Sequence, residues 1–157
     1  MLEQNRSRWD QLQIQRGLAS LARAERLARP LGPYTLQAAI AACHARARRA
    51  EDTDWLRIVA LYDALLEATQ SPVVALNRAV AVAMAFGPAQ GLELVDELAD
   101  ALPTYHLLPS VRGDLLARLG RRDEARVEFE RAAAMTRNER ERELLLRRAR
   151  ECGIDAG

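Results

Sequence analysis

The fold of this chain is decided by residues 71–136, which read SPVVALNRAVAVAMAFGPAQGLELVDELADALPTYHLLPSVRGDLLARLGRRDEARVEFERAAAMT. Within this stretch the same pattern of small, large and turn residues occurs twice, and the two copies are separated by a constant number of residues. The positions of the later copy, followed by those of the earlier copy, are Gly113, Leu116, Gly120, Ala125, Phe129 and Ala132, and Ala79, Val82, Phe86, Gly91, Val95 and Leu98. The copies differ at the turn, because the glycine of the earlier copy stands at Gly87.

The offset between the two copies, as from Ala79 to Gly113, equals the repeat length of tetratricopeptide repeats, which are pairs of antiparallel helices. The two helices approach closely only where one offers Gly or Ala and the other inserts a bulky side chain. Because one pair cannot bury its apolar face alone, neighbouring pairs must stack. Pro103 closes the earlier copy, as the repeat requires. We therefore expect an all-α fold, a tetratricopeptide-repeat-like stack of antiparallel helix pairs with about seven helices.

Residues typical of helix ends predict where each helix begins and ends. Residues 1–30 are expected to form an N-terminal linker helix and residues 31–157 a tetratricopeptide-like helical domain, the whole chain being a single compact domain. N-cap candidates are the residues of the acidic turn Glu51, Asp52, Thr53 and Asp54, and Ser71; Asn138 followed by Glu141 fits a capping box. The helices expected in the domain cover residues 33–48, 54–69, 72–86, 88–101, 105–119, 122–135 and 138–151. Pro109 fits this scheme only if it lies in the first turn of its helix.

Charge is unevenly distributed along the chain, although its net value is only +1. All 23 basic residues are arginine. Residues 1–50 carry nine arginines against three acidic residues, residues 51–117 carry three against ten, and residues 118–157 carry eleven against nine. A molecule with a basic front and an acidic middle is better suited to contact another protein surface than to bind a polyanion along its length.

Catalytic, metal and cofactor sites are not expected. The candidate metal ligands Cys43, His44, His106 and Cys152 show no ligand spacing, and neither histidine lies beside a nucleophile in a recognisable motif. No glycine-rich phosphate loop is present. The start of the sequence lacks the apolar region of a signal peptide, and no uncharged run is long enough to span a bilayer, so a cytoplasmic protein is expected.

The candidate site is a partner-binding groove. In a tetratricopeptide stack the first helix of each pair lines the concave groove, and polar residues interrupt these helices at Gln37, His44, Asn77, Arg78 and Arg112. An arginine in a largely apolar helix must find acceptors, because a buried unpaired charge costs several kcal/mol. Arg78 therefore has two open interpretations, an internal bond to a carboxylate or carbonyl and a contact with a partner in the groove.

Five separated segments of the chain, taken together and in order, resemble the C-terminal extension of a group of bacterial extracytoplasmic-function sigma factors. Such extensions carry tetratricopeptide-like helices after the promoter-binding regions. The segments are GPYTLQAAIAACHARA (residues 32–47), TDWLRIVALYDALL (residues 53–66), SPVVALNRAVAVA (residues 71–83), YHLLPSVRGDLLARLGR (residues 105–121) and TRNERERELLLRRA (residues 136–149).

The resemblance implies a regulatory domain that acts in transcription initiation through protein contacts. Its expected partners are the other domains of the same sigma factor, core RNA polymerase or a regulatory protein, with neither direct DNA binding nor membrane binding by this fragment. The regions that bind the minus ten and minus thirty-five elements are not among these 157 residues. The alternative is a free-standing tetratricopeptide-like adapter that binds a peptide or a small regulatory protein.

Overall fold

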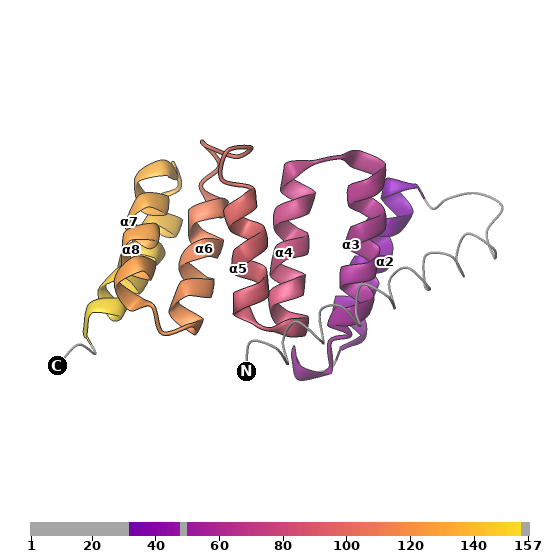
Figure 1. Cartoon of the computed structure of the whole chain (residues 1–157), viewed down its shortest axis with the longest axis horizontal. Helices are drawn as coiled ribbons and strands as arrows, with labels where there is room; N and C mark the ends of the chain where they lie inside the picture. Colours follow the sequence, from indigo (N-terminus) through magenta and orange to yellow (C-terminus); the bar gives the residue numbers. More distant parts are fainter. Residues whose placement is uncertain (1–31, 48–49, 155–157) are drawn as a thin grey trace. The chain divides into compact units, whose positions relative to one another are not determined.

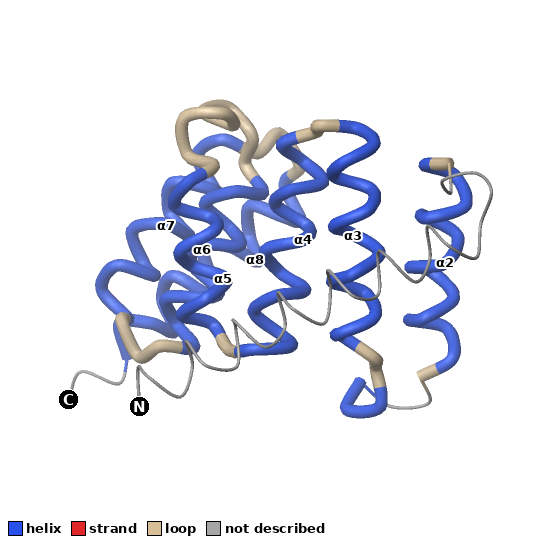
Figure 2. The backbone as a smooth tube through the Cα atoms, turned by 45° about the vertical axis from the view of Figure 1, so that its right-hand side comes forward, coloured by secondary structure: helices blue, strands red, loops and turns tan. Residues whose placement is uncertain are grey.

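The computed structural model describes residues 32–47 and 50–154, and within these ranges the chain is all-helical and contains no strand. The linker helix expected in residues 1–30 lies outside the described residues. Packing of consecutive helices confirms the expected all-α fold and agrees with a tetratricopeptide-like stack (Figures 1 and 2). The helices are α2 (Pro33–Arg46), α3 (Trp55–Thr69), α4 (Pro72–Phe86), α5 (Pro88–Glu97), α6 (Leu107–Arg118), α7 (Arg122–Met135) and α8 (Glu139–Ile154), with a short 3-10 helix at Ala50–Asp52.

The chain divides into two compact units between Phe86 and Gly87, each of which is described by itself. In the first unit α3 packs against both α2 and α4. Its fully buried side chains are almost all aliphatic; the largest are Leu36, Ile58, Val59, Leu65, Leu76 and Val82. Burial of aliphatic surface is therefore the main stabilising contribution in this unit.

Helix starts in the first unit follow the sequence signals. The carboxylate of Asp54 accepts a hydrogen bond from the backbone N–H of Arg57, at 3.1 Å. The hydroxyl of Ser71 accepts one from Val74, at 3.4 Å, and Pro72 is the first residue of α4. These bonds satisfy backbone donors that have no partner within the helix. Asp54 is thus the N-cap among the candidates of the acidic turn, and the predicted cap at Ser71 is confirmed.

The second unit consists of α5, α6, α7 and α8, each packed on the next. Gly120 turns the chain from α6 into α7 with φ +77°, a conformation that side chains with a Cβ rarely adopt. Pro109 is the third residue of α6 and so lies in its first turn, as predicted. The largest boundary differences are that α5 ends at Glu97 instead of residue 101 and that α8 continues to Ile154 instead of residue 151.

The small and large positions of the later repeat copy interlock between α6 and α7. A Cβ atom placed on Gly113 would lie 2.8 Å from the ring of Phe129, which is 1% exposed. The guanidinium of Arg148 lies over the same ring, 4.6 Å from its centroid, and also pairs with Asp114. Helices α6, α7 and α8 are thus joined around one aromatic side chain.

The start of α8 corrects the predicted capping box. The side chain of Asn138 accepts a hydrogen bond from the backbone N–H of Glu141, at 3.1 Å, as a cap should. The carboxylate of Glu141 does not return to Asn138, because it is engaged by His106 Nε2 and by the hydroxyl of Thr136, each at 3.0 Å. The same hydroxyl accepts the backbone N–H of Asn138, at 3.3 Å. In the expected capping box the Glu141 side chain would bond the backbone of Asn138; here it bonds His106 and Thr136 instead.

Candidate interaction site

The predicted groove residues of α2 are both accessible. Gln37 and His44 are exposed, and because they are two turns apart they share one face of the helix. The ring of His44 meets the ring of Trp55 edge-on, with centroids 5.4 Å apart. The His44 side chain is therefore positioned by α3 and remains open to contact from outside.

The two predicted residues of α4 differ from each other. Asn77 is exposed, whereas Arg78 is half-buried and its Nε donates to the Asp63 carboxylate on α3, at 2.5 Å. Side-chain exposures are 16% for Arg78 and 24% for Asp63, so both groups are largely removed from water. This contact favours the internal interpretation of Arg78, because a partner would have to compete with Asp63 for the guanidinium.

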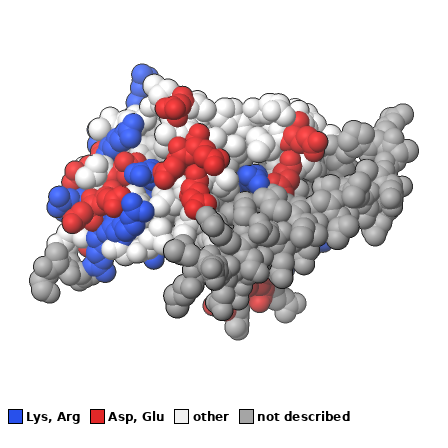
Figure 3. Space-filling model, viewed as in Figure 1, with Lys and Arg blue, Asp and Glu red and all other residues white. Residues whose placement is uncertain are grey.

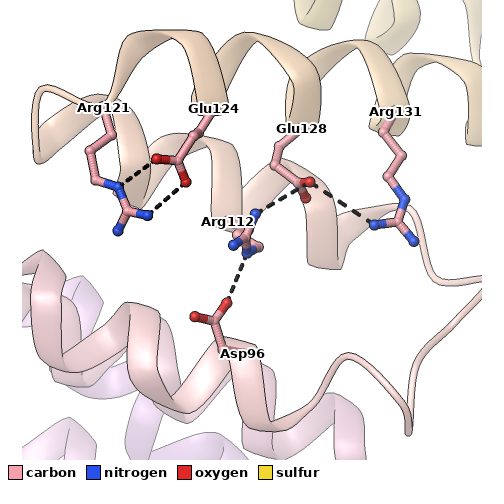
Figure 4. Close-up of polar contacts among 6 residues, drawn as sticks. All are labelled: Asp96, Arg112, Arg121, Glu124, Glu128 and Arg131. Carbon is pink, nitrogen blue, oxygen red and sulfur yellow. Dashed lines mark hydrogen bonds and ion pairs between the residues drawn. The ribbon is translucent and has the colours of Figure 1, made fainter.

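Arg112 belongs to the second unit, where it bridges two helices (Figure 4). Its Nε donates to Asp96 on α5, at 2.8 Å, and its Nη1 lies 3.3 Å from Glu128 on α7. The hydrogen bond to Asp96 and the charges of Asp96 and Glu128 raise the pKa of Arg112, against the opposing effect of burial. Arg112 therefore joins α5, α6 and α7 electrostatically.

Arg78 and Arg112 occupy the same repeat position, since they stand one repeat length apart. Each pairs with an aspartate on the helix that comes before its own, Asp63 in the first unit and Asp96 in the second. His44 stands one further repeat length before Arg78. The repeat thus carries a recurring polar position, and in two of its three occurrences that position fastens one helix to the preceding one.

Glu128 is a buried acidic residue that the sequence did not reveal. Its side chain is 8% exposed, and its Oε2 is buried without a hydrogen-bond partner among the described residues. Its Oε1 faces Arg112 and, at 4.0 Å, Arg131 (Figure 4). A usable signal was present, because Glu128 precedes Phe129 on a helix whose buried face the repeat pattern had located.

A second pair on α7 lies at the edge of this network. Arg121 donates to both oxygens of Glu124, at 3.0 and 2.6 Å. This hydrogen bonding lowers the pKa of Glu124. Both side chains are about half exposed, so the pair contributes little to stability.

The structure brings Arg78 and Arg112 into internal ion pairs and leaves Gln37, His44 and Asn77 exposed. Four of the five residues lie in the first unit and Arg112 in the second, so a single groove that contains all of them stays a prediction. Among the described residues, no group of three or more His, Cys, Asp and Glu side chains is placed to hold a metal ion. In the same ranges, no helix combines the length and the apolarity needed to cross a bilayer.

Charged side chains also mark the outside of the second unit. Figure 3 shows acidic groups gathered over α5 and mixed arginine and acidic groups over α7 and α8. The exposed acidic residues of the α5 segment recur at helical spacing and are Glu93, Asp96, Glu97 and Asp100. The arrangement offers charged surfaces for protein contacts.

Comparison with known proteins gives one relative. The chain is 48% identical over 136 residues to an uncharacterized protein of Rhizobium meliloti (strain 1021). The match covers 87% of this chain but 32% of the relative, so the chain spans about a third of that protein's length. No protein-family model matches the chain. No solved structure matches it significantly.

Proposed function

We propose that this chain is a protein-interaction and regulatory C-terminal domain of an extracytoplasmic-function RNA polymerase sigma factor, acting in transcription initiation through protein contacts. The observation that carries the proposal is the ordered set of five segments that resemble such extensions. They fall on α2, α3, α4, α6 and α8, so the resemblance includes helices of both units. A relative about three times as long as the matched region is compatible with a domain that recurs inside a longer protein.

The residues available to such a partner are the exposed ones. Gln37, His44 and Asn77 present an amide, an imidazole and a second amide, which suit neutral polar contacts with backbone or side chains of another protein. Arg78 joins them only if a partner carboxylate replaces Asp63. The domain is a scaffold for binding in this proposal and has no catalytic role.

The proposal is tested by binding to core RNA polymerase and to the promoter-binding regions of a sigma factor from the same organism. The chain should be retained by one of them, and the triple variant Gln37→Ala, His44→Ala, Asn77→Ala should weaken binding about tenfold or more with unchanged helicity. Glu67→Ala, an exposed change on α3, is the matched control. Absence of binding to both proteins rejects the sigma-factor role.

Arg78→Ala separates the two interpretations of that residue. Loss of binding with intact helicity and stability assigns Arg78 to the groove, and lower stability with binding retained assigns it to the internal pair with Asp63. Retention of a peptide or small regulatory protein, without binding to polymerase or sigma regions, would support the adapter alternative.

A further inference from the structure

The outward side of α8 combines arginines with exposed apolar side chains. We call this surface the α8 face; it comprises Arg140, Leu144, Leu146, Arg147, Arg150 and Ile154. Leu144 is 45% exposed, Leu146 37% and Ile154 74%, which are high values for large aliphatic residues of a helix that also supplies buried core. Large apolar side chains gathered on one exposed helix face commonly mark an interaction surface.

A shallow groove follows the α8 face. It has a volume of about 470 Å³ and is lined by residues of α7 and α8. The α7 residues are Arg126 and Glu130, and the α8 residues are Leu146, Ala149, Arg150, Gly153 and Ile154. A neighbouring hollow of about 300 Å³ is bounded by Arg140, Glu143, Leu144, Arg147 and Arg150.

The arginines of α8 fall into two groups. Arg142 donates to the carbonyls of Ala133 and Thr136, and Arg148 pairs with Asp114, so these two secure the helix. Arg140, Arg147 and Arg150 are exposed and form no ion pair with any residue in 32–47 or 50–154. The arginines that hold α8 in place are therefore distinct from those that line its outer side.

We infer that the α8 face binds an acidic amphipathic helix of another protein. Three unpaired guanidinium groups favour carboxylates, which Arg binds with two parallel hydrogen bonds. Exposed Leu144, Leu146 and Ile154 favour apolar side chains at helical spacing. Gly153, which is exposed and lines the groove, has no side chain to keep a helix at a distance.

Two other occupants fit the surface less well. A nucleic acid would leave Leu144, Leu146 and Ile154 without apolar contacts, because its phosphates gain nothing from these side chains. A second copy of this chain could offer its acidic α5, but Asp96 there is already engaged by Arg112, and that face carries no large exposed aliphatic residue among Pro88–Glu97. The inference uses none of the five predicted groove residues and does not depend on the proposed sigma-factor role.

The test uses the whole chain and a labelled peptide of about 16 residues, with leucines at helical i, i+3, i+4 and i+7 spacing and glutamates between them. Fluorescence anisotropy should give a dissociation constant on the order of 10 µM, weakened by added salt. Reversal of Arg140, Arg147 and Arg150 to Glu should weaken binding at least about tenfold. The control reverses Arg46, Arg57 and Arg137, which are exposed arginines outside the face, and should change binding less than about twofold.

Gly153→Leu tests the groove separately from charge. A Cβ at Gly153 would make an ordinary contact 3.9 Å from Arg126, the rest of the leucine side chain would occupy the groove, and leucine has the higher helix propensity. Peptide binding should fall about tenfold while the melting temperature is not lowered. The inference is overturned by failure of the wild-type chain to bind, by equal binding of a scrambled peptide, by equal loss in the control variant, by tighter binding of a DNA duplex, or by self-association that the peptide displaces.

Discussion

The side-chain contacts that hold the helices together differ between the two units of the molecule. In the first unit, α2, α3 and α4 are held by aliphatic side chains, with the Arg78–Asp63 pair between α3 and α4. In the second unit, Phe129 fits against Gly113 under the guanidinium of Arg148, and Arg112 links two carboxylates on either side of its helix. The second unit therefore adds aromatic and ionic contacts between its helices to a buried aliphatic core of its own.

The two units also show that the arginine at one repeat position makes different contacts in different surroundings. Arg78 and Arg112 are equivalent in the repeat pattern and each reaches an aspartate of the preceding helix. Only Arg112 has the additional, buried partner Glu128. The same local sequence feature thus makes one helix-to-helix link in the first unit and is the centre of a network in the second.

The largest expected effect is that of Phe129→Ala, which removes the aromatic ring at the α6–α7 contact. The free energy of unfolding should fall by about 3–5 kcal/mol, because a large cavity remains where the ring was. Leu65→Ala, at a fully buried site of the first unit, is the comparison and should cost about 2–4 kcal/mol. Urea denaturation measures both. A smaller loss for Phe129→Ala than for Leu65→Ala would contradict a central role of the Phe129 ring in holding α6, α7 and α8 together.

Gly113→Ala should destabilise the protein by about 1–3 kcal/mol, since the added methyl group overlaps the buried Phe129 ring. Gly153→Ala provides a matched control on α8, because the Cβ there makes only an ordinary contact. The control should be neutral or stabilising by up to about 1 kcal/mol through helix propensity. Thermal melts that show equal shifts for the two variants would refute the interlock.

Replacing Arg78 or Arg112 by methionine tests whether the arginine that joins two helices contributes less to stability than the arginine that joins three. Arg112→Met leaves the Glu128 carboxylate buried without its nearer cation and should cost about 1–3 kcal/mol. Arg78→Met should cost only about 0.5–1.5 kcal/mol, because the Asp63 side chain is 24% exposed, against 8% for Glu128, and so is better hydrated. Denaturant titration compares the loss in unfolding free energy of the two variants. A larger loss for Arg78→Met than for Arg112→Met would argue that the buried Glu128 carboxylate is not the cause of the difference.

The smallest effect is a pH dependence at the start of α8. Hydrogen bonds from His106, first, and Thr136 lower the pKa of Glu141 below its ordinary value of 4.5. The carboxylate therefore contributes stability above pH 4.5 that is lost as the pH falls through its lower, folded-state pKa. Because the site is a third exposed, the contribution is below about 1 kcal/mol.

Glu141→Gln should abolish this dependence, whereas Glu143→Gln, on the exposed side of the same helix, should retain it. Unfolding free energies measured on both sides of pH 4.5 compare the two variants. If the unfolding free energies of the two variants depended on pH in the same way, Glu141 would not be the origin of the dependence.

Local and periodic features of the fold were predictable from the sequence. The repeat interval placed Gly113 against Phe129, and cap residues located the starts of α3 and α4. The end of α5 was not predictable, because after Glu97 the backbone changes to turns, with Leu98 bonding the carbonyl of Val95. Its charged residues continue the helical spacing past that point, which hid the boundary.

The candidate site was predictable in part. The pattern identified arginines that need acceptors, at Arg78 and Arg112, but could not name Asp63, Asp96 or Glu128 as the acceptors. Those contacts join residues on different helices, and each carboxylate taken alone resembles an ordinary solvated charge. The stack geometry, which sequence spacing does not contain, decides which carboxylate meets which arginine.

Helix α8 is attached to the rest of its unit at two levels, by Glu141 with His106 near its start and by Arg148 with Asp114 and the Phe129 ring farther along. Its hold on the unit thus does not depend on the short peptide connection at residues 136–138. A protease cut there would leave a nicked protein whose two pieces remain associated until the guanidinium and the carboxylate are both released.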